Sequence, residues 1–182
     1  MLLFLDETLL RLFPPLRAAW ALAGEQAAVR ISGRNAKRVL FGAINPRTGH
    51  RIVQVRRQMW QQDFQAFLRE LRRRYPGRPL WLLLDRAPCH TAVRSQALAL
   101  RLGIELLWLP KQCSELNAMD QLWKELKLHV SANRQYATVD EHGAAAERWV
   151  LGLAPPQALR KAGILSPGFW LRDLLRNFRR PT

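Results

Sequence analysis

The chain has 182 residues, of which 48% are hydrophobic, enough for one domain with a substantial core and too many for an intrinsically disordered chain. No apolar stretch approaches the roughly 20 residues of a membrane-spanning helix, so we expect no membrane partner. Lysine and arginine number 29 against 14 acidic residues, a formal net charge of +15, which indicates a polyanionic partner such as nucleic acid. A soluble basic domain with a skewed composition is the alternative.

The first third of the chain has the pattern of an antiparallel meander. An apolar run at Leu2–Leu5 stops at Asp6 and predicts a first strand that ends there. Two further strands are predicted at Ala28–Ile31 and Val39–Ile44, joined by the basic turn SGRNAKR. The turn signals of INPRTGHR then lead into the alternating sequence RIVQVR at 51–56, which predicts another strand.

Helices and strands alternate in the remainder. Apolar residues at helical spacing predict a helix over Gln61–Arg74, and the continuous apolar run Leu80–Leu84 predicts a central strand covered on both faces. Further along we expect a helix at Thr91–Leu102, a strand at 104–110, a loop at 111–117, a helix at Ala118–Val130 with Asn117 as its N-cap, and two more helices within 138–153 and 166–180.

This order of elements predicts the fold. Three antiparallel strands followed by alternating helices and strands favour an α/β architecture, with a mixed five-stranded sheet flanked by helices. Ribonuclease H-like domains have this arrangement. We expect residues 1–182 to form a single catalytic domain, in which residues from about 138 to 182 make a C-terminal helical extension.

Three aspartates occupy positions that this fold brings together. Asp6 ends the first predicted strand, Asp85 ends the central strand, and Asp120 lies in the first turn of a later helix. Converging carboxylates repel each other unless a cation lies between them, and their hard oxygens suit Mg²⁺ or Mn²⁺. Two such ions would activate a water or a 3′-hydroxyl for attack on a phosphodiester. Each aspartate alone also fits an ordinary turn, surface or helix-start position, so the prediction depends on all three.

Three blocks of sequence carry a family resemblance. LFLDET, LLLDRAPCH and LPKQCSELNAMDQLWKELK follow one another in this order, and 34 residues separate Asp85 from Asp120. The blocks, their order and this spacing resemble the DDE/D transposases (DDE superfamily endonucleases), above all the mariner-like superfamily and its bacterial insertion-sequence relatives. The resemblance extends from about Leu2 to about Phe178, nearly the whole chain.

The resemblance implies a metal-dependent transposase catalytic domain that cleaves DNA ends and transfers the strand. Asp6, Asp85 and Asp120 match the positions of the catalytic, metal-binding triad, with Mg²⁺ or Mn²⁺, in two ions, as the cofactor. The implied partners are DNA, at the element ends and the target, and a second copy of the chain on that DNA. The two cysteines are too few for a disulfide framework. We therefore expect a cytoplasmic location, associated with the nucleoid of a bacterium.

The chain departs from the family pattern at several positions and in one larger respect. Arg86 stands where the family has asparagine, which puts a cation beside a predicted metal ligand. Ala118 replaces a proline, and the third acid is aspartate, as in mariner elements. The family also carries a helix-turn-helix region before the catalytic domain. We expect this chain to be the second frame of a split gene, a truncated copy or an excised domain, with an upstream helix-turn-helix polypeptide as a candidate partner.

Several basic residues are candidates for DNA contacts. The basic turn is interpreted either as an exposed hairpin that binds DNA or as a solvated turn, and His90 either as a contact near the active site or as a structural hydrogen-bonding group. Trp123 is expected in the core. The predicted DNA-binding residues are Arg34, Lys37, Arg38, Arg86, His90, Lys124 and Lys127. The tail RNFRR is a further candidate for phosphate contacts.

Two other functions compete with transposition. A ribonuclease H-like nuclease would use the same three aspartates and cut without joining. A decayed or domesticated DNA-binding remnant would keep the basic surface without the chemistry, and Arg86 together with the missing helix-turn-helix region favours this interpretation.

Overall fold

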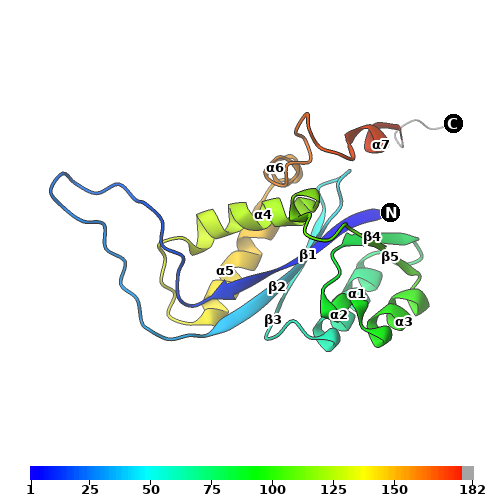
Figure 1. Cartoon of the computed structure of the whole chain (residues 1–182), viewed down its shortest axis with the longest axis horizontal. Coiled ribbons are helices and arrows are strands. Elements are labelled where there is room, and N and C mark those ends of the chain that lie inside the picture. Colours follow the sequence, from blue (N-terminus) through cyan, green and yellow to red (C-terminus); the bar gives the residue numbers. More distant parts are fainter. Residues whose placement is uncertain (178–182) are drawn as a thin grey trace.

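The computed structural model describes residues 1–177 and shows one mixed sheet with helices on both faces (Figure 1). The strand order is β3-β2-β1-β4-β5; β1 pairs antiparallel with β2 and parallel with β4. The predicted five-stranded arrangement is therefore confirmed. The strands are β1 Leu2–Arg11, β2 Lys37–Ile44, β3 Arg51–Arg56, β4 Leu80–Leu84 and β5 Ile104–Trp108.

Each strand of the sheet divides its side chains between two hydrophobic cores. In β1, Phe4 and Leu10 pack on the side of helices α4 (Ala118–Leu126) and α5 (Val139–Gly152), while Leu3 and Leu5 pack on the other side. That other side is covered by α1 (Gln61–Arg74) and α3 (Val93–Arg101), and α1 buries the apolar residues that its sequence predicted. Successive side chains of a strand point to opposite faces, so the two-residue period decides which core each residue enters.

β1 is longer than predicted, and Asp6 lies inside it. Only Leu2–Phe4 pair with β4, but pairing with β2 continues as far as Arg11 and keeps the chain extended. The prediction that the first strand ends at Asp6 is therefore wrong. β1 has a neighbouring strand on both sides only as far as Phe4. Asp6 lies just beyond that part of the strand, and the apolar run ends there.

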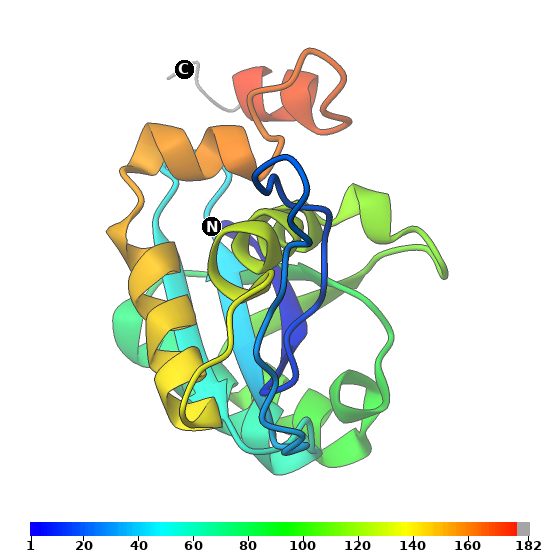
Figure 2. The same ribbon diagram turned by 90° about the vertical axis from the view of Figure 1, so that its left-hand side faces the viewer.

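An exposed arm of residues 12–36 joins β1 to β2 and extends from the body (Figure 1); Figure 2 views it end-on. The strand predicted at Ala28–Ile31 is wrong, because this segment pairs with no other strand and its apolar residues Val29 and Ile31 are only partly buried. Elsewhere on the arm, Trp20 is fully exposed. The base of the arm is held by Asn133, whose side chain accepts from the Arg17 N–H at 2.8 Å and donates to the Arg17 carbonyl at 2.9 Å.

The helix predicted at Thr91–Leu102 is two helices. The short helix α2, Pro88–Thr91, ends at Ala92, whose extended backbone (ψ 130°) separates it from α3. Proline at the first position of α2 has the φ that a helix start needs, and this moves the beginning of the helical region ahead of the prediction. Helix α4 begins at Ala118 as predicted, with Asn117 as its N-cap, and continues into a π-helical turn at Lys127–Ser131.

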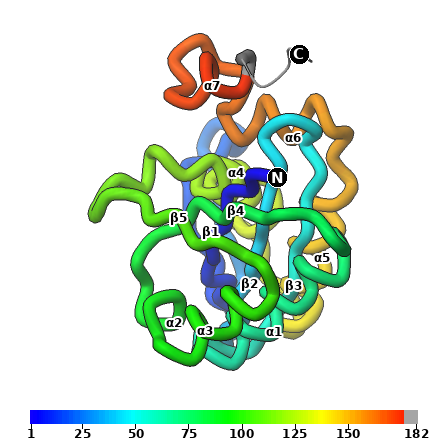
Figure 3. Tube along the Cα trace, turned by 90° about the vertical axis from the view of Figure 1, so that its right-hand side faces the viewer, coloured from blue at the N-terminus to red at the C-terminus, as the bar shows by residue number. Residues whose placement is uncertain are grey.

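The C-terminal extension is helical, as expected, but is divided differently. Helix α5 fills the predicted segment and begins after Thr138, whose hydroxyl accepts from the Glu141 N–H. Helix α6, Pro155–Lys161, was not predicted, and α7, Arg172–Asn177, is shorter than the predicted 166–180. The end of the basic tail RNFRR lies outside the described residues. Figure 3 shows α7 at the end of the molecule opposite α2 and α3. Within residues 1–177, no helix has both the length and the apolar character needed to span a bilayer.

Candidate active site

The alternation of the strands brings the three aspartates to the α4 side of the sheet. Asp6 lies two residues beyond Phe4, and Asp85 two residues beyond Leu83, and both of those apolar residues belong to the core beneath α4. Phe4 pairs with Leu83, so continuing this register sets Asp6 opposite Asp85. Asp120 comes from the first turn of α4 itself.

These three side chains line one pocket of about 380 Å³, called the aspartate pocket below. Its other walls come from Arg86 and Ala87, which follow β4, and from the loop 109–114 that follows β5. The carboxyl ends of the parallel strands β4 and β5 therefore form its rim, which is where ligands bind in open α/β sheets. The predicted convergence of the aspartates is what the structure shows, although Asp6 reaches it from the middle of a strand.

Asn117 holds the third aspartate in place relative to the first. Its side-chain oxygen accepts from the Met119 N–H at 3.1 Å and caps α4, while its amide donates to the carbonyl of Leu5 at 2.8 Å. The residue bonded on β1 directly precedes Asp6, so one buried side chain joins the start of α4 to the strand that carries the first aspartate. This contact fixes how the helix bearing Asp120 approaches the sheet.

Asp6 is the one of the three aspartates that has no counter-ion among the described residues. Burial, together with the neighbouring charges of Glu7, Asp85 and Asp120, raises the pKa of Asp6 to about 8, against the opposing effect of a hydrogen bond from the Glu7 backbone. Within residues 1–177, no lysine or arginine forms an ion pair with Asp6, whereas Asp120 pairs with Lys124 at 2.8 Å. Hard carboxylate oxygens with uncompensated charge fit a divalent cation such as Mg²⁺ or Mn²⁺.

The three carboxylates do not lie close enough together to form a complete set of metal ligands. Among the described residues, no three His, Cys, Asp or Glu side chains are arranged closely enough to hold a metal ion. The ion pair between Asp120 and Lys124 gives a physical reason, since it satisfies the third carboxylate from outside the group. A bound cation would have to replace that lysine as the partner of Asp120.

The carboxylate of Asp85 is hydrogen-bonded to a buried histidine, His90. Its Oδ1 accepts from the Ala87 N–H at 3.0 Å and lies 2.9 Å from Nδ1 of His90. The bond to His90, followed by the one to Ala87, holds the pKa of Asp85 below its ordinary value against the effect of burial. On the far side of the ring, Nε2 of His90 lies 2.9 Å from Oε1 of Glu7. Burial opposes the charge on His90, but the bonds to Asp85, Cys89 and Glu7 outweigh it and raise its pKa to about 12.

The position of His90 corrects one prediction. Its ring is completely buried and packs against Phe64 of α1, with the ring centres 4.5 Å apart. The expectation that His90 contacts DNA is therefore wrong, and the alternative of a structural hydrogen-bonding group is confirmed. Glu7 was missed altogether. The available signal was its place in a buried strand, one residue after Asp6 and therefore facing the opposite core.

The other predicted DNA-binding residues fall into two groups. Arg86 at the rim of the aspartate pocket, 5.9 Å from the centre of the Trp108 ring, and Lys124 and Lys127 on and after α4 lie on the aspartate side. Arg34 in the arm and Lys37 at the start of β2 are exposed and lie at the far end of β1. Their contact with DNA stays a prediction.

Arg38, at the start of β2, is already engaged within the protein. Its guanidinium binds both carboxylate oxygens of Asp140, at 2.7 and 2.9 Å, and its side chain is only 19% exposed. A bidentate pair of this kind joins β2 to the first turn of α5. Arg38 is therefore a structural residue, and the predicted hairpin around it is also wrong, because no strand precedes the turn.

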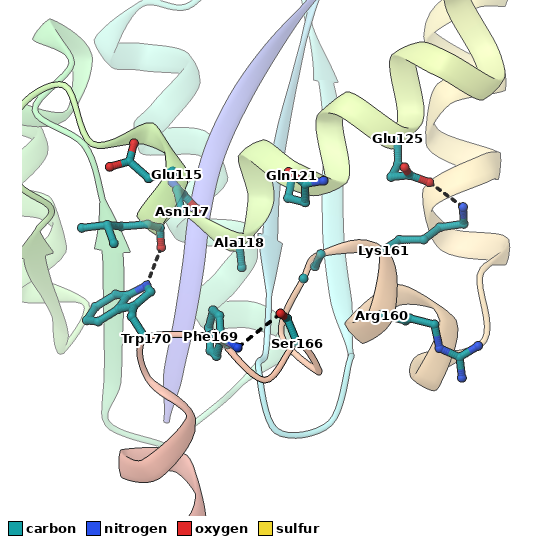
Figure 4. Close-up of a pocket in the computed structure, with 14 residues that line it drawn as sticks. Glu115, Asn117, Ala118, Gln121, Glu125, Arg160, Lys161, Ser166, Phe169 and Trp170 are labelled. Atoms are coloured by element: carbon teal, nitrogen blue, oxygen red, sulfur yellow. Dashed lines mark hydrogen bonds and ion pairs between the residues drawn. The ribbon is translucent and has the colours of Figure 1, made fainter.

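A larger pocket, of about 660 Å³, lies between α4, α6 and the segment 166–170 (Figure 4). Figure 4 shows Glu125 paired with Lys161, at 2.6 Å, and the indole N–H of Trp170 donating to the carbonyl of Leu116, at 2.9 Å. Glu125, which lines this pocket, thus has its own cation. The two pockets share Asn117.

Comparison with known proteins identifies the family. Residues 1–142 match the family model described as DDE superfamily endonuclease. No curated protein matches the sequence significantly. Among solved structures, the mariner Mos1 paired-end complex with Mg superposes with a TM-score of 0.72 at 18% identity, covering 100% of this chain and 56% of that one. A pre-cleavage Mos1 transpososome gives 0.70 at 17% identity, covering 100% and 56%.

The match to the isolated catalytic domain of Mos1 mariner transposase extends over a larger share of the matched protein. Its TM-score is 0.63 at 13% identity, over 100% of this chain and 84% of that domain. The chain thus spans about half the length of the Mos1 chains in the DNA complexes. At these identities the structural matches establish the fold, and they confirm the predicted ribonuclease H-like arrangement. With more than half of its residues matched by the family model, the chain belongs to the DDE superfamily endonucleases.

Proposed function

We propose that this chain is the catalytic domain of a transposase, which cleaves DNA at the ends of an insertion sequence and joins the freed end to target DNA. The observation that carries the proposal is the meeting of Asp6, Asp85 and Asp120 in one pocket of a DDE-family chain. The Mos1 structures that it resembles include a paired-end complex with a transposon end and a strand transfer complex. Transposition explains both the family and the net charge of +15.

The three aspartates are the proposed holders of Mg²⁺ or Mn²⁺, in two ions. Mos1 structures with Mg and with Mn support the choice of metal. A divalent ion bound there supplies charge stabilisation to the attacking and leaving oxygens of a phosphodiester. The raised pKa of Asp6 supports the same assignment, because a carboxylate that is reluctant to ionise among its neighbours gains most from a cation.

The chain's own residues orient this chemistry. The bonds from Ala87 and His90 fix one oxygen of Asp85, and Asn117 fixes the start of α4 against β1. In the proposed sequence, water first attacks the phosphorus at the element's end and releases a 3′-hydroxyl. That hydroxyl then attacks a phosphodiester of the target, forming one P–O bond as another breaks. Both steps need the same fixed set of oxygens, which rigid strands and a capped helix provide.

The proposed assembly is a homodimer on DNA. The arm of residues 12–36 supports it, because Leu16, Trp20 and Leu22 on that arm are more than half exposed. Large exposed apolar groups of this kind mark surfaces for a partner. Recognition of element ends is assigned to a helix-turn-helix polypeptide from an upstream frame, and the location to the nucleoid of a bacterial cytoplasm.

Nicking of supercoiled plasmid with Mn²⁺ or Mg²⁺ tests the proposal, with joining of a labelled 3′-ended oligonucleotide to plasmid as a second readout. We expect metal-dependent nicking and joining, both lost in Asp85→Ala and retained in the matched control Glu125→Gln, whose carboxylate lies in the larger pocket. Cutting of an RNA–DNA hybrid without joining would instead favour a ribonuclease H-like nuclease.

The second candidate, a DNA-binding remnant, is favoured by one observation. Arg86 places a cation at the rim of the aspartate pocket, where its charge would repel a metal ion. DNA binding without nicking, even when an upstream helix-turn-helix polypeptide is supplied, would support this alternative.

A further inference from the structure

Glu7 and His90 form a buried group that does not itself line the aspartate pocket. Glu7 is 3% exposed and His90 is completely buried, and each ring nitrogen faces a carboxylate oxygen: Nε2 faces Glu7 and Nδ1 faces Asp85, both at 2.9 Å. A carboxylate only accepts hydrogen bonds, so both ring nitrogens donate. One imidazolium thus lies between two carboxylates.

The group crosses from one side of the sheet to the other. Glu7 faces the α1 side, where His90 packs on Phe64, while Asp85 belongs to the aspartate pocket on the α4 side. The short helix α2 makes the crossing possible, since it begins three residues after Asp85 and turns His90 back beneath it. A charged side chain almost never lies fully buried without paired partners, so this arrangement needs a reason.

The contacts treat the two oxygens of Asp85 differently. Oδ1 receives both donors, from the Ala87 N–H at 3.0 Å and from His90 at 2.9 Å. Among the described residues, Oδ2 has no hydrogen-bond partner, and 58% of the side chain is exposed. The carboxylate therefore has one fixed oxygen and one that is free for a ligand in the aspartate pocket.

We propose that Glu7 and His90 are positioning residues, which lock the rotation of the Asp85 carboxylate so that Oδ2 is presented to the metal. This inference rests on the proposed function. Hydrogen bonds to a ligating side chain orient it, and their removal typically weakens metal affinity by about 10- to 100-fold. Glu7 holds the His90 ring in place, and the ring in turn holds the Asp85 carboxylate.

The test separates the contributions of the two ring nitrogens of His90. An asparagine at position 90 places its amide nitrogen near the position of Nδ1, and a glutamine places it near that of Nε2. Both substitutions are made together with Glu7→Gln, so that no carboxylate is left buried and unpaired. Glu7→Gln/His90→Asn keeps a donor for Asp85, whereas Glu7→Gln/His90→Gln keeps only the contact with position 7.

Mn²⁺ affinity of the full chain is measured by electron paramagnetic resonance, with thermal unfolding beside it. We expect Glu7→Gln/His90→Asn, which keeps the donor to Asp85 but loses its anchor at position 7, to bind Mn²⁺ about threefold more weakly than wild type, and Glu7→Gln/His90→Gln to bind it about 10- to 100-fold more weakly. His142→Asn is the matched control. His142 is also buried and bonds Ser131 and the Arg11 carbonyl, so its loss should lower the melting temperature without changing Mn²⁺ affinity.

Ala87→Pro provides a test that leaves Glu7 and His90 intact. It removes the other donor to Oδ1 at a φ of −58°, which proline adopts without strain. We expect a folded protein with about tenfold weaker Mn²⁺ binding. The inference is overturned if this variant and both double variants bind Mn²⁺ like wild type. Equal weakening in both double variants and in His142→Asn would also overturn it, since stability alone would explain the loss. A wild type that neither binds Mn²⁺ nor nicks DNA would instead remove the proposed function, and this inference with it.

Discussion

The two pockets beside the start of α4 differ both in volume and in how their acidic residues are paired. The larger pocket encloses about 660 Å³, and its acid Glu125 lies 2.6 Å from Lys161. The aspartate pocket encloses about 380 Å³ and gathers three carboxylates, one of which has a pKa raised to about 8. A carboxyl group that is costly to ionise and has no counter-ion among the described residues gains from a bound cation, so the smaller pocket is the one that favours a ligand. Volume alone would have selected the wrong site.

The largest expected effect distinguishes the two pockets by activity. Asp6→Ala, Asp85→Ala and Asp120→Ala should each reduce plasmid nicking to the level seen without divalent metal, because each removes one of the oxygens proposed to hold it. Glu125→Gln should nick within about threefold of wild type, since an exposed or half-exposed ion pair contributes little beyond local stability. An equal loss of nicking activity in all four variants, measured on identically purified protein, would show that the two pockets do not differ in function.

The next effect concerns stability and pH. Folded Asp6 keeps its proton up to about pH 8, whereas an unfolded aspartate releases it near its ordinary pKa of 3.8. Between these values the folded state binds more protons, so the free energy of unfolding falls as pH rises from about 4 to about 8 without divalent metal. The loss should be on the order of a few kcal/mol.

Urea unfolding across this pH range checks the effect. In Asp6→Asn the decline should be much smaller, and in wild type added Mn²⁺ should oppose it, because a cation favours the ionised carboxylate. The same decline in wild type and Asp6→Asn would mean that Asp6 ionises normally.

A smaller effect is expected from the cation at the rim. Arg86→Asn, which restores the residue that the family pattern carries, should tighten Mn²⁺ binding by about two- to fivefold, the size of one solvent-exposed charge interaction. Arg101→Gln at the end of α3 is the control, since it removes the same charge away from the pocket. Calorimetric titration of both variants decides this, and unchanged affinity in Arg86→Asn would show that Arg86 points its charge elsewhere.

The smallest effect belongs to the larger pocket. Lys161→Met should lower the free energy of unfolding by about 0.5–1 kcal/mol, as expected for an ion pair that solvent still reaches (the two side chains are 29% and 28% exposed), and leave Mn²⁺ affinity unchanged. A double-mutant cycle with Glu125→Gln, followed by urea unfolding, isolates the pair. A change in Mn²⁺ affinity in this cycle would show that the two pockets are coupled through Asn117.

Local patterns predicted the elements that local contacts form. Helix α1 follows from its apolar spacing, and β4 from its uninterrupted apolar run. The aspartates were also within reach, because a family motif and a strand ending at Asp85 are both properties of short segments. Asn117 as the cap of α4 belongs to the same class, since capping depends on residues within one turn.

The elements that sequence reasoning missed depend on distant partners. The second half of β1 is a strand only because β2 pairs with it, and the residues at Ala28–Ile31 are not one because nothing does. The bond between His90 and Glu7 joins positions 83 residues apart, so no local sequence pattern predicts it. Tertiary pairing, not propensity, decided each of these.

Binding of Mn²⁺ to wild type, Asp6→Asn, Asp85→Asn and Asp120→Asn is the most direct measurement of whether one metal centre uses all three aspartates. These variants keep the size of each side chain and remove only its charge. We predict that wild type binds Mn²⁺, that each of the three binds it far more weakly, and that Glu125→Gln binds like wild type. Affinity equal to that of wild type in any one of the three would contradict a shared site.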